Sequence, residues 1–444
     1  MKLTVVGAGS TYTPGLVLRW LETKRDRIPI DELCLYDIDP GRLETIYRFV
    51  EPMLRAETPG ICVRATTDRR DALTGAAFVV LQIRVGLNQQ RLIDEHICVK
   101  HGFVGQETTG PGGFALALRQ IPAAVDIARD VSCYAPDAWL ISVANPAGVL
   151  AEALIKHGHV KTIGMCHGGF FPRAVIARQL GVQECMIEFD YLGLNHLGWI
   201  PRIYVGGKRL PDDRLAELAA AVYAEWNKFE LNLPPEFARD FCPPFTIHHY
   251  LTYFYLHDEA LAEMRTTGRT RADTVLEIER ECLDYYEREA GRRLTPPPAL
   301  TKRGGAIEET QRGNYGAVGY SDGCLGVIDA LIHPEPQRLV VNVLNEGSIT
   351  DLPADAAVEV SAIVSNLGVS RLNLGPLPVE VRAQVAAVQA YETMTVEAAL
   401  TGDRRRALAA LLSHPFCQCR YRATKALLEE LLEANRMYLP AFFK

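Results

Sequence analysis

The stretch VVGAGSTYTPGLVLRW, residues 5–20, decides the fold of the first part of this chain. Two valines end an apolar run and Gly7-Ala8-Gly9 follows, which is how a β-strand passes into a phosphate-binding turn. A third glycine usually occupies position 12 of this fingerprint, but Tyr12 stands there, and Pro14 follows where a helix can begin with a missing N–H. The stretch predicts a dinucleotide-binding turn whose amides and hydroxyls meet a pyrophosphate. The expected cofactor-binding residues of the turn are Gly7, Gly9, Ser10 and Thr11.

The residues that follow alternate between apolar strands and helical segments, as in repeated βαβ units. Asp37, at the end of the second strand, can accept hydrogen bonds from the adenosine ribose, and its charge would repel a 2′-phosphate, which favours NAD over NADP. Asp39 is the alternative for this role. The expected segments are strands over 3–9, 32–39, 76–86 and 138–150 and helices over 13–24 and 43–57.

The second half of the chain has a mixed pattern. We expect strands over 186–205 and 338–345, helices over 212–229 and 246–290, a glycine-rich loop over 303–323, and helices from there to the C-terminus apart from that later strand. The sequence thus predicts an α/β fold of two domains with a cleft between them. Residues 1–165 form a Rossmann-type NAD-binding domain like that of malate and lactate dehydrogenases, and residues 166–444 form a mixed α+β domain that binds metal and substrate.

Composition and net charge argue against two classes of function, nucleic-acid binding and membrane spanning. The net charge of −7 gives no overall positive field for nucleic acid, and no run approaches the roughly 20 apolar residues that span a bilayer. Eleven cysteines without framework spacing indicate reduced thiols. Cys417 and Cys419 lie near His414, but a zinc site needs further ligands, so helix packing is the better interpretation. We expect a cytoplasmic protein with no nucleic-acid or membrane partner.

A dinucleotide turn alone makes a dehydrogenase the default hypothesis, yet the unusual residues lie elsewhere. The glycines and paired threonines of GQETTGPGG, residues 105–113, are too irregular for packing needs alone. Together with GAGSTYTPGLV, LYDIDPGRLE, RVG at 84–86, NPAG at 145–148, GLNHLGW at 193–199 and NEGSITDLP at 345–353, this segment resembles glycoside hydrolase family 4. The resemblance is greatest to the 6-phospho-β-glucosidase branch and runs from the first strand to about residue 390.

The resemblance implies a redox-neutral mechanism that differs from paired-carboxylate hydrolysis. In this family NAD+ takes a hydride from C3 of the sugar, a base removes the acidified proton on C2, and a divalent metal, usually Mn2+, stabilises the enediolate. The glycosidic oxygen leaves by elimination, water adds, and the hydride returns. The implied substrate is a small-molecule glycoside, and the implied cofactors are NAD+ and Mn2+ or another divalent metal.

Family motifs also suggest the remaining site residues. Cys166 in IGMCHGG and His196 in GLNHLGW match the metal-ligand positions, although a lone cysteine after a strand is usually a core residue. Tyr250 in HHYLTYFYLHDEAL matches the proton-abstracting tyrosine, while Tyr253 and Tyr255 are better explained as an aromatic helix face. A phenol can act as a base only if nearby cations lower its pKa. The positions that match the sugar site are Arg84, Glu107 and Asn145, although Asn-Pro is also a common way to start a turn.

Two segments depart from the family pattern. His167 follows the metal cysteine where the α branch has an acid and the β branch usually has Asn, so His167 serves either as a proton donor or as a support behind the site. After KRGGA at 302–306 the chain inserts IEETQRGNYGAVG before Tyr320. Arg303 or Arg312 could bind a 6-phosphate, but Glu308 and Glu309 in the insertion oppose an anion.

Several alternatives therefore stay open at this stage. The substrate could be unphosphorylated or α-linked, and the chain could be a simple NAD-dependent polyol or hydroxy-acid dehydrogenase, which would accumulate NADH with its substrate. A regulatory NAD-binding protein is disfavoured by the Cys166 and His196 pair. Family resemblance suggests a homodimer or homotetramer, and the apolar helical segments after residue 380 could form its interface.

Overall fold

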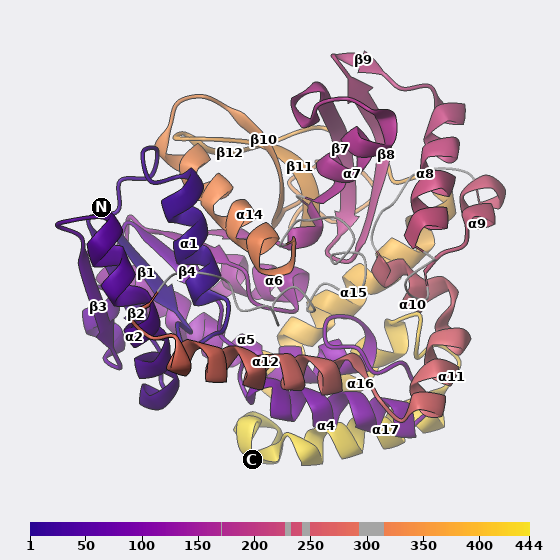
Figure 1. Ribbon diagram of the computed structural model, residues 1–444. Coiled ribbons are helices and arrows are strands. Elements are labelled where there is room, and N and C mark those ends of the chain that lie inside the picture. Colours follow the sequence, from indigo (N-terminus) through magenta and orange to yellow (C-terminus); the bar gives the residue numbers. More distant parts are fainter. Residues whose placement is uncertain (170, 227–231, 242–248, 293–314) are drawn as a thin grey trace.

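The computed structural model describes residues 1–169, 171–226, 232–241, 249–292 and 315–444 (Figure 1). A nine-stranded sheet runs through the molecule in the order β12-β11-β10-β6-β5-β4-β1-β2-β3. Six of its strands are parallel and have the doubly wound order 3-2-1-4-5-6. Their order reverses between β1 and β4, which is where such a sheet opens a ligand crevice. These strands are β1 (Lys2–Val6), β2 (Glu32–Tyr36), β3 (Cys62–Thr66), β4 (Phe78–Leu81), β5 (Trp139–Ser142) and β6 (Lys161–Gly164).

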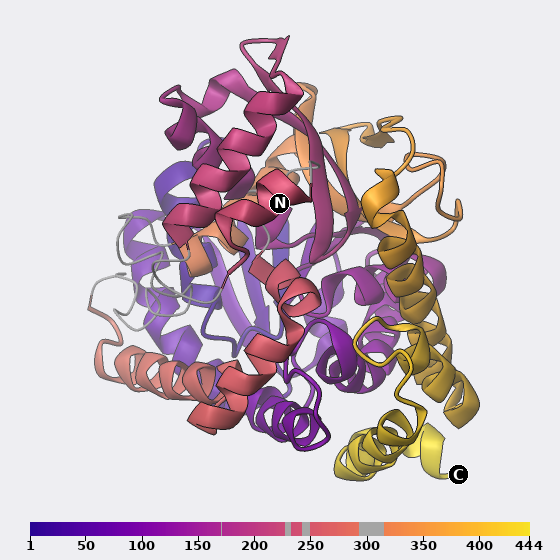
Figure 2. The same ribbon diagram turned by 90° about the vertical axis from the view of Figure 1, so that its right-hand side faces the viewer.

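Helices cover both faces of this parallel region. On one face α1 packs against α2 and α14, and on the other α5 and α6 pack against each other and against α15 (Figures 1 and 2). Strand residues that point to either face are buried, for example the consecutive pairs Val5 and Val6 of β1 and Val79 and Val80 of β4, so the strands are apolar without alternation. The helices of the first half are α1 (Thr13–Thr23), α2 (Pro40–Glu57), α3 (Arg69–Leu73), α4 (Leu87–Lys100), α5 (Gly110–Tyr134) and α6 (Ala147–His157).

Three strands from the second half extend the same sheet. β10 (Gln337–Leu344) pairs antiparallel with β6 through Asn342 and Gly164, and β11 (Ala357–Ser365) and β12 (Gly368–Arg371) continue outward. The strand expected over 338–345 is confirmed, but the expectation of helices throughout the rest of this region is wrong for β11 and β12. Both faces of β11 are buried, including Glu359 and Ser361, the polar residues that alternate with its valines, so β11 has no solvent-exposed polar face.

A second, smaller sheet stands against the first. β7 (Ile187–Leu194), β8 (Leu197–Val205) and β9 (Lys208–Arg209) are antiparallel, which confirms the strands expected over 186–205. β7 packs on β11, where the backbone N–H of Tyr191 donates to Oγ of Ser361 at 3.0 Å. Only Asn195 and His196 connect β7 to β8, and His196 has the left-handed φ of +63°. This tight turn holds His196 at the end of the hairpin.

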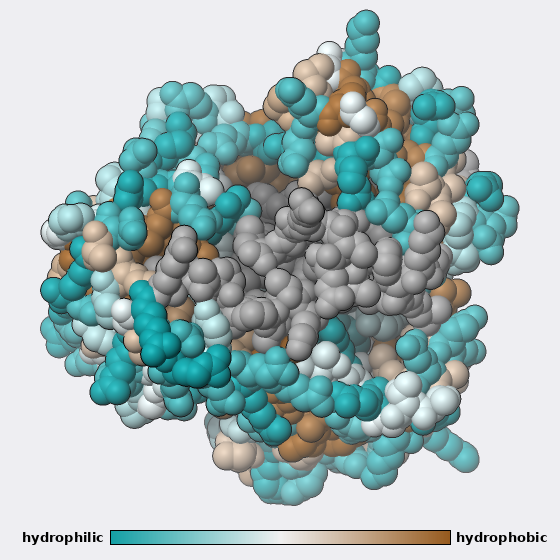
Figure 3. Space-filling view, viewed as in Figure 1, coloured by the Kyte–Doolittle hydropathy of each residue, from teal (hydrophilic) through white to brown (hydrophobic). Residues whose placement is uncertain are grey.

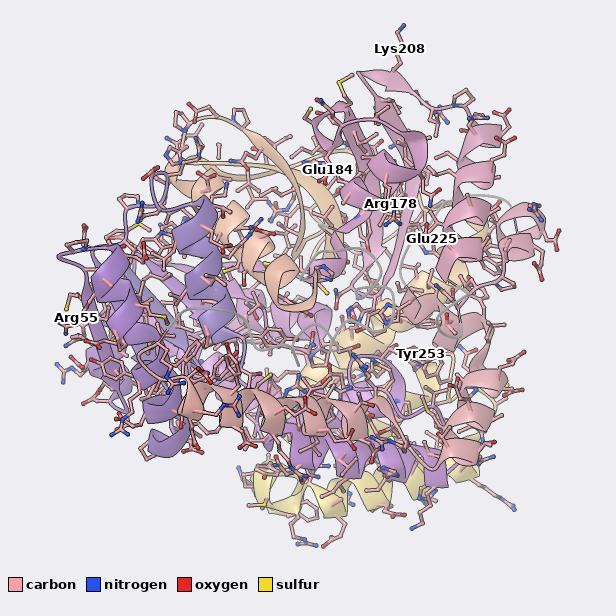
Figure 4. All side chains as sticks on the ribbon, viewed as in Figure 1. Arg55, Arg178, Glu184, Lys208, Glu225 and Tyr253 are labelled. Atoms are coloured by element: carbon pink, nitrogen blue, oxygen red, sulfur yellow. The ribbon has the colours of Figure 1, made fainter. Side chains whose placement is uncertain are left out.

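The remaining helices complete the second half. α7 and α8 lie beside the small sheet, where Arg178 and Glu225 point toward one another with a 3.1 Å ion pair (Figure 4). The helices are α7 (Phe171–Leu180), α8 (Asp212–Trp226), α9 (Pro235–Asp240), α10 (Thr252–Tyr255), α11 (His257–Thr267), α12 (Arg271–Arg288), α14 (Tyr315–Ile332), α15 (Val379–Thr401), α16 (Arg404–Ser413) and α17 (Tyr421–Ala434). Short 3-10 turns span His167–Gly169, Glu184–Met186, His249–Leu251, Arg436–Tyr438 and Pro440–Phe443.

Helix α14 corrects the glycine-rich loop expected over 303–323. Residues 303–314 lie outside the described residues, but from Tyr315 onward the chain is helical. Glycine costs a helix about 1 kcal/mol relative to alanine. The buried side chains of Leu325, Val327 and Ile328 and the packing of α14 on α1 outweigh that cost.

Helix α12 belongs to the second half of the sequence but packs on α2 and α4 of the first half. Its inner face is buried, and its outer face is charged and hydrophilic in Figure 3. The shared sheet and α12 interleave the two halves of the chain, and the division at residue 165 stays a prediction. No helix in the described part of the chain is long and apolar enough to cross a membrane.

Candidate active site

The turn after β1 requires glycine for steric reasons. Gly7 has a φ of +87°, and a Cβ there would lie 2.9 Å from the backbone nitrogen of Ile83. A Cβ at Gly9 would lie 2.8 Å from Cβ of Arg42 and 2.9 Å from Oδ2 of Asp37. These distances are too short for a side chain at either position. Glycine at both positions therefore lets the backbone of the turn pack against these neighbours and line the cavity.

The missing third glycine is explained by the direction of Tyr12. Its side chain lines the cavity, and its ring lies 5.6 Å from the ring of Tyr320 on α14. Thr13 ties the helix to the turn, because its Oγ1 donates to the carbonyl of Ala8 at 2.8 Å and accepts from Nε2 of Gln82 at 2.6 Å. The turn is therefore intact without the third glycine.

Asp37 and Asp39 have different roles in the structure. Oδ2 of Asp37 accepts from the N–H of Gly9 at 2.8 Å, and its Oδ1 accepts from the N–H of Asp39 at 3.0 Å. Asp39 caps α2 by accepting from the N–H groups of Gly41 and Arg42 at 2.9 and 3.1 Å. Both aspartates line the cavity, where Asp37 places negative charge beside the turn.

The cavity has a volume of about 820 Å³ and extends from this turn to the end of the β7–β8 hairpin. It is lined by residues from both halves of the sequence. Arg303 lies outside the described residues. The other proposed site residues all line it, namely Gly7, Gly9, Ser10, Thr11, Asp37, Arg84, Glu107, Asn145, Cys166, His167, His196 and Tyr250.

Cys166 and His196 meet at the inner end of the cavity. Cys166 follows β6 and His196 lies in the β7–β8 turn, yet Sγ and Nε2 are 3.3 Å apart and both side chains are buried. Burial and the nearby Glu359 raise the pKa of the Cys166 thiol to about 11. The described residues contain no group of three or more His, Cys, Asp or Glu that could hold a metal. The pair places a thiol and an imidazole nitrogen side by side, two groups that could serve as ligands of one cation.

Tyr250 stacks directly on this pair. Its ring lies 3.6 Å from the ring of His196 with an interplanar angle of 10°. Burial raises the pKa of Tyr250 well above its ordinary value, and Cys166, Glu107 and Tyr253 raise it further, while Arg91 lowers it. Tyr253 also lines the cavity and is labelled near the centre of Figure 4. Tyr255 instead points away and donates to Oε1 of Gln384 at 2.9 Å.

A charged cluster lines another part of the cavity wall. Glu107 forms one ion pair with Arg84 and a second with Nη1 of Arg91 at 3.1 Å. Arg91 also binds Glu95 at 2.7 Å. Burial lowers the pKa of Arg91, but Glu107 and Glu95 raise it above its usual value overall, so Arg91 is charged. Nδ2 of Asn145 lies 3.5 Å from the other oxygen of Glu107.

His167 lies in the 3-10 turn after Cys166, with its ring 5.9 Å from that of Tyr320. Burial and the neighbouring His249 lower the pKa of His167 to about 4. At neutral pH the imidazole is therefore uncharged. A histidine acts as a general acid from its protonated form, which this lowered pKa disfavours at neutral pH, and the donor role of His167 stays a prediction.

Comparison with known proteins identifies the family. The model described as "Family 4 glycosyl hydrolase" matches residues 2–182, and that of the "Family 4 glycosyl hydrolase C-terminal domain" matches residues 191–417. The chain belongs to glycosyl hydrolase family 4. The resemblance drawn from the sequence motifs is confirmed, and so is the expectation that the protein is a glycosidase.

Relatives of this family 4 enzyme cover its whole length. A probable 6-phospho-beta-glucosidase of Bacillus subtilis (strain 168) is 34% identical over 452 residues, covering 100% of this chain and 98% of the relative. A phospho-alpha-glucosidase of Clostridium acetobutylicum is 30% identical over 452 residues, covering 98% of each. The solved 6-phospho-beta glucosidase of Thermotoga maritima with manganese, NAD+ and glucose-6-phosphate is 30% identical with a TM-score of 0.84, covering 99% of each chain.

The fold class is confirmed as well. Malate dehydrogenase from Plasmodium falciparum matches with a TM-score of 0.53, covering 90% of this chain and 98% of that one, at 14% identity. This likeness concerns the fold alone. It agrees with the Rossmann strand order of the family 4 chain.

Sequence reasoning missed several residues of this family 4 site. Arg91 lies on α4, whose buried face is polar and gives no apolar stripe to mark it. Gln120 on α5 binds the backbone at Ile83, Val85 and Asn145, and Tyr320 lies in a segment expected to be a loop. The sequence signal for Arg91 was its spacing of four from Glu95, which allows an ion pair on one helix face.

Proposed function

We propose that this family 4 enzyme hydrolyses 6-phospho-β-glucosides, with NAD+ and Mn2+ as cofactors and no net redox change. The approach of Cys166 Sγ to within 3.3 Å of His196 Nε2, inside a cavity that begins at the NAD turn, carries the proposal. Dehydrogenases of the malate and lactate type use a histidine base and an arginine for the substrate carboxylate, so the thiol and imidazole pair favours the glycosidase over a dehydrogenase of that type.

The residues present suit both cofactors. The closely packed Gly7 and Gly9 leave the backbone of the turn free to approach a pyrophosphate, and the charge of Asp37 disfavours a 2′-phosphate. Cys166 and His196 supply two ligands, which leaves room for sugar oxygens on a divalent cation. When bound, NAD+ accepts a hydride from C3 of the sugar and later returns it, and the divalent cation stabilises negative charge on the C2 and C3 oxygens.

The protein's own residues position the sugar and move its protons. We assign Tyr250 as the base that removes the C2 proton. The charged Arg91 lowers the pKa of Tyr250 and so favours its phenolate form. Tyr250 stacks on His196, so a cation held by His196 would lower that pKa further. Arg84 and Asn145 can hold sugar hydroxyls, because Glu107 fixes both side chains at the cavity wall.

The β-phosphoglucoside is the substrate class favoured by the relatives. The Bacillus subtilis relative, at 34% identity, is a probable 6-phospho-beta-glucosidase, and the Thermotoga maritima structure holds glucose-6-phosphate. The phospho-alpha-glucosidase of Clostridium acetobutylicum is a relative at 30%, so the α anomer is the second candidate. Arg303 is proposed to bind the 6-phosphate.

A panel of aryl glycosides tests this proposal. Each glycoside is assayed as the α and β anomer, with and without a 6-phosphate, in the presence of NAD+, Mn2+ and a thiol. We expect hydrolysis of the 6-phospho-β-glucoside without accumulation of NADH, slower reaction of substrate deuterated at C2, and loss of activity when NAD+ is removed or a chelator is added. Activity that persists in both treatments would contradict the mechanism, and stoichiometric NADH would favour the dehydrogenase.

The base is tested by a matched pair of tyrosines. Tyr250→Phe should lower kcat by about a hundredfold or more, since a positioned base contributes about that much. Tyr255→Phe is the control, because the hydroxyl of Tyr255 binds Gln384 outside the cavity lining. Equal losses in the two variants would remove Tyr250 from the role of base.

We further propose that the enzyme works in the cytoplasm as a homodimer or homotetramer. The described cysteines are all free, which suits a reducing compartment. Light scattering of the purified protein at several concentrations measures the subunit number, and a monomer at every concentration would contradict the assembly.

A further inference from the structure

The loop that carries GQETTGPGG lies directly behind the metal pair. The hydroxyl of Thr108 lies 2.8 Å from Nδ1 of His196, the ring nitrogen that faces away from Cys166. His196 is buried, and Thr108 is half-buried. Thr108 is thus the polar partner on the far side of the imidazole.

The direction of this hydrogen bond is fixed by Gln106. One side-chain atom of Gln106 lies 2.6 Å from the backbone nitrogen of Thr108 and 3.0 Å from that of Thr109. Two N–H donors face that atom, so it is the carbonyl oxygen Oε1. The hydroxyl of Thr108 lies 2.9 Å from the same oxygen and must donate its one hydrogen there.

With its hydrogen committed to Gln106, the Thr108 oxygen can only accept from His196. We infer that Gln106 and Thr108 hold His196 in the tautomer with hydrogen on Nδ1, which turns the Nε2 lone pair toward Cys166 and a bound divalent cation. Thr108 is a positioning residue, and it acts through His196. A metal-bound histidine needs a partner of this kind on its other nitrogen, because that bond orients the ring and sets the tautomer.

The glycines of the loop make this arrangement possible. A Cβ at Gly112 would lie 2.3 Å from the carbonyl oxygen of Gln106, and a Cβ at Gly113 would lie 2.7 Å from the carbonyl carbon of Thr108. The loop can therefore fold back onto the start of α5 only without side chains at these two positions. Glycine at positions 112 and 113 thus allows the loop conformation in which Gln106, Thr108 and His196 form a chain of hydrogen bonds.

Titration with Mn2+, followed by the electron paramagnetic resonance signal of the free ion, tests the inference without measuring activity. Thr108→Val keeps the shape and removes the hydroxyl, and should weaken Mn2+ binding by about 10- to 100-fold. Thr108→Ser keeps the hydroxyl and should restore binding close to that of the unmodified protein. Thr109→Val is the matched control, because the neighbouring hydroxyl of Thr109 faces His414 at 3.3 Å and not His196.

Bound Co2+ gives a second readout. A thiolate charge-transfer band should remain in Thr108→Ser and Thr109→Val and should weaken or shift in Thr108→Val. If Thr108→Val does not fold, as judged by thermal unfolding and NAD+ binding, Thr108→Ala takes its place with the same expectation.

Equal Mn2+ affinity in Thr108→Val and the unmodified protein, or an equal loss in Thr109→Val, would overturn the inference. The inference rests on the proposed metal site. Failure of the unmodified protein to bind Mn2+ would overturn that site itself, which distinguishes the two results.

Discussion

Gln120 shows how a single buried residue can set the shape of the substrate wall. Its Oε1 accepts from the N–H of Val85 at 2.9 Å, and its Nε2 donates to the carbonyls of Ile83 and Asn145 at 2.7 and 3.1 Å. The turn that carries Arg84 and the segment that carries Asn145 are thereby joined through one side chain on α5. The sequence gives no sign of this link, because Gln120 looks like any other polar residue in a helix.

Replacing Gln120 by Met tests this link. The change removes three hydrogen bonds and leaves Arg84 and Asn145 less well placed, so we expect KM for the glycoside to rise by about tenfold, as for other outer-shell partners. NAD+ affinity should change little, because the turn after β1 does not depend on this side chain. Gln389→Met, at a buried glutamine on α15 whose amide binds Thr393, is the control. Unchanged KM in Gln120→Met would show that the wall is held by other contacts.

At the scale of single helices, strands and turns, the sequence predicted the elements whose structure depends on their own residues. The turn after β1 and the strands within 186–205 follow from glycines and apolar runs. The cap of α2 by Asp39 was missed, because the sequence indicates Asp39 as an alternative ribose ligand and a helix that begins at residue 43. The helix α14 and the strand β11 did not follow, because packing on α1 and β7 overrides their glycines and buried polar residues. Motifs led to the predicted site residues that line the cavity, and their roles stay predictions. Arg91, Gln120 and Thr108 were missed because each contacts another residue of the site and has no motif role of its own.

The start of α5 offers a prediction at this scale. In Gly112→Ala the new Cβ would lie 2.3 Å from a backbone oxygen, so the loop must move, and we expect a loss of about 1–3 kcal/mol in the free energy of unfolding together with weaker Mn2+ binding. Gly326→Ala on α14 is the matched control, because no described atom lies within 4 Å of its Cβ. It should stabilise the protein by up to about 1 kcal/mol. Urea unfolding measures both, and equal stability of the two variants would contradict the steric argument.

At the scale of the whole molecule, the second half of the chain holds the nucleotide turn of the first. The hydroxyl of Tyr286 on α12 donates to the carbonyl of Thr11 at 2.9 Å, and Glu279 on the same helix binds Arg42 at 2.7 Å and Asn88 at 2.9 Å. Arg42 in turn donates to the carbonyl of Gly9 at 3.2 Å. The turn after β1 is therefore held in part by contacts from the second half of the sequence.

His414, in the C-terminal segment, contacts Thr109 and Gly110 at the start of α5. Its surroundings predict that the free energy of unfolding depends on pH. The neutral ring can carry its one hydrogen on Nε2, 3.3 Å from the hydroxyl oxygen of Thr109, and accept at Nδ1 from the backbone N–H of Phe416 at 3.2 Å. A second ring proton, on Nδ1, would face that N–H donor. Burial, with a contribution from His257, lowers the pKa of His414 to about 3 from its ordinary value of 6.5. The neutral ring therefore stabilises the fold above about pH 6.5 and progressively loses that contribution as the pH falls toward 3.

The size of the effect follows from about 1.4 kcal/mol for each unit of pKa shift. Lowering the pH from 7 to 5 should cost the unmodified protein about 2 kcal/mol of unfolding free energy through His414. His414→Gln has no proton to gain, so its stability should fall less over the same interval, whatever its value at pH 7. Urea unfolding of both proteins at pH 5 and pH 7 gives the comparison. Parallel losses would place the acid sensitivity elsewhere, and a smaller loss in His414→Gln would locate it at the joint between the C-terminal segment and the loop behind the metal pair.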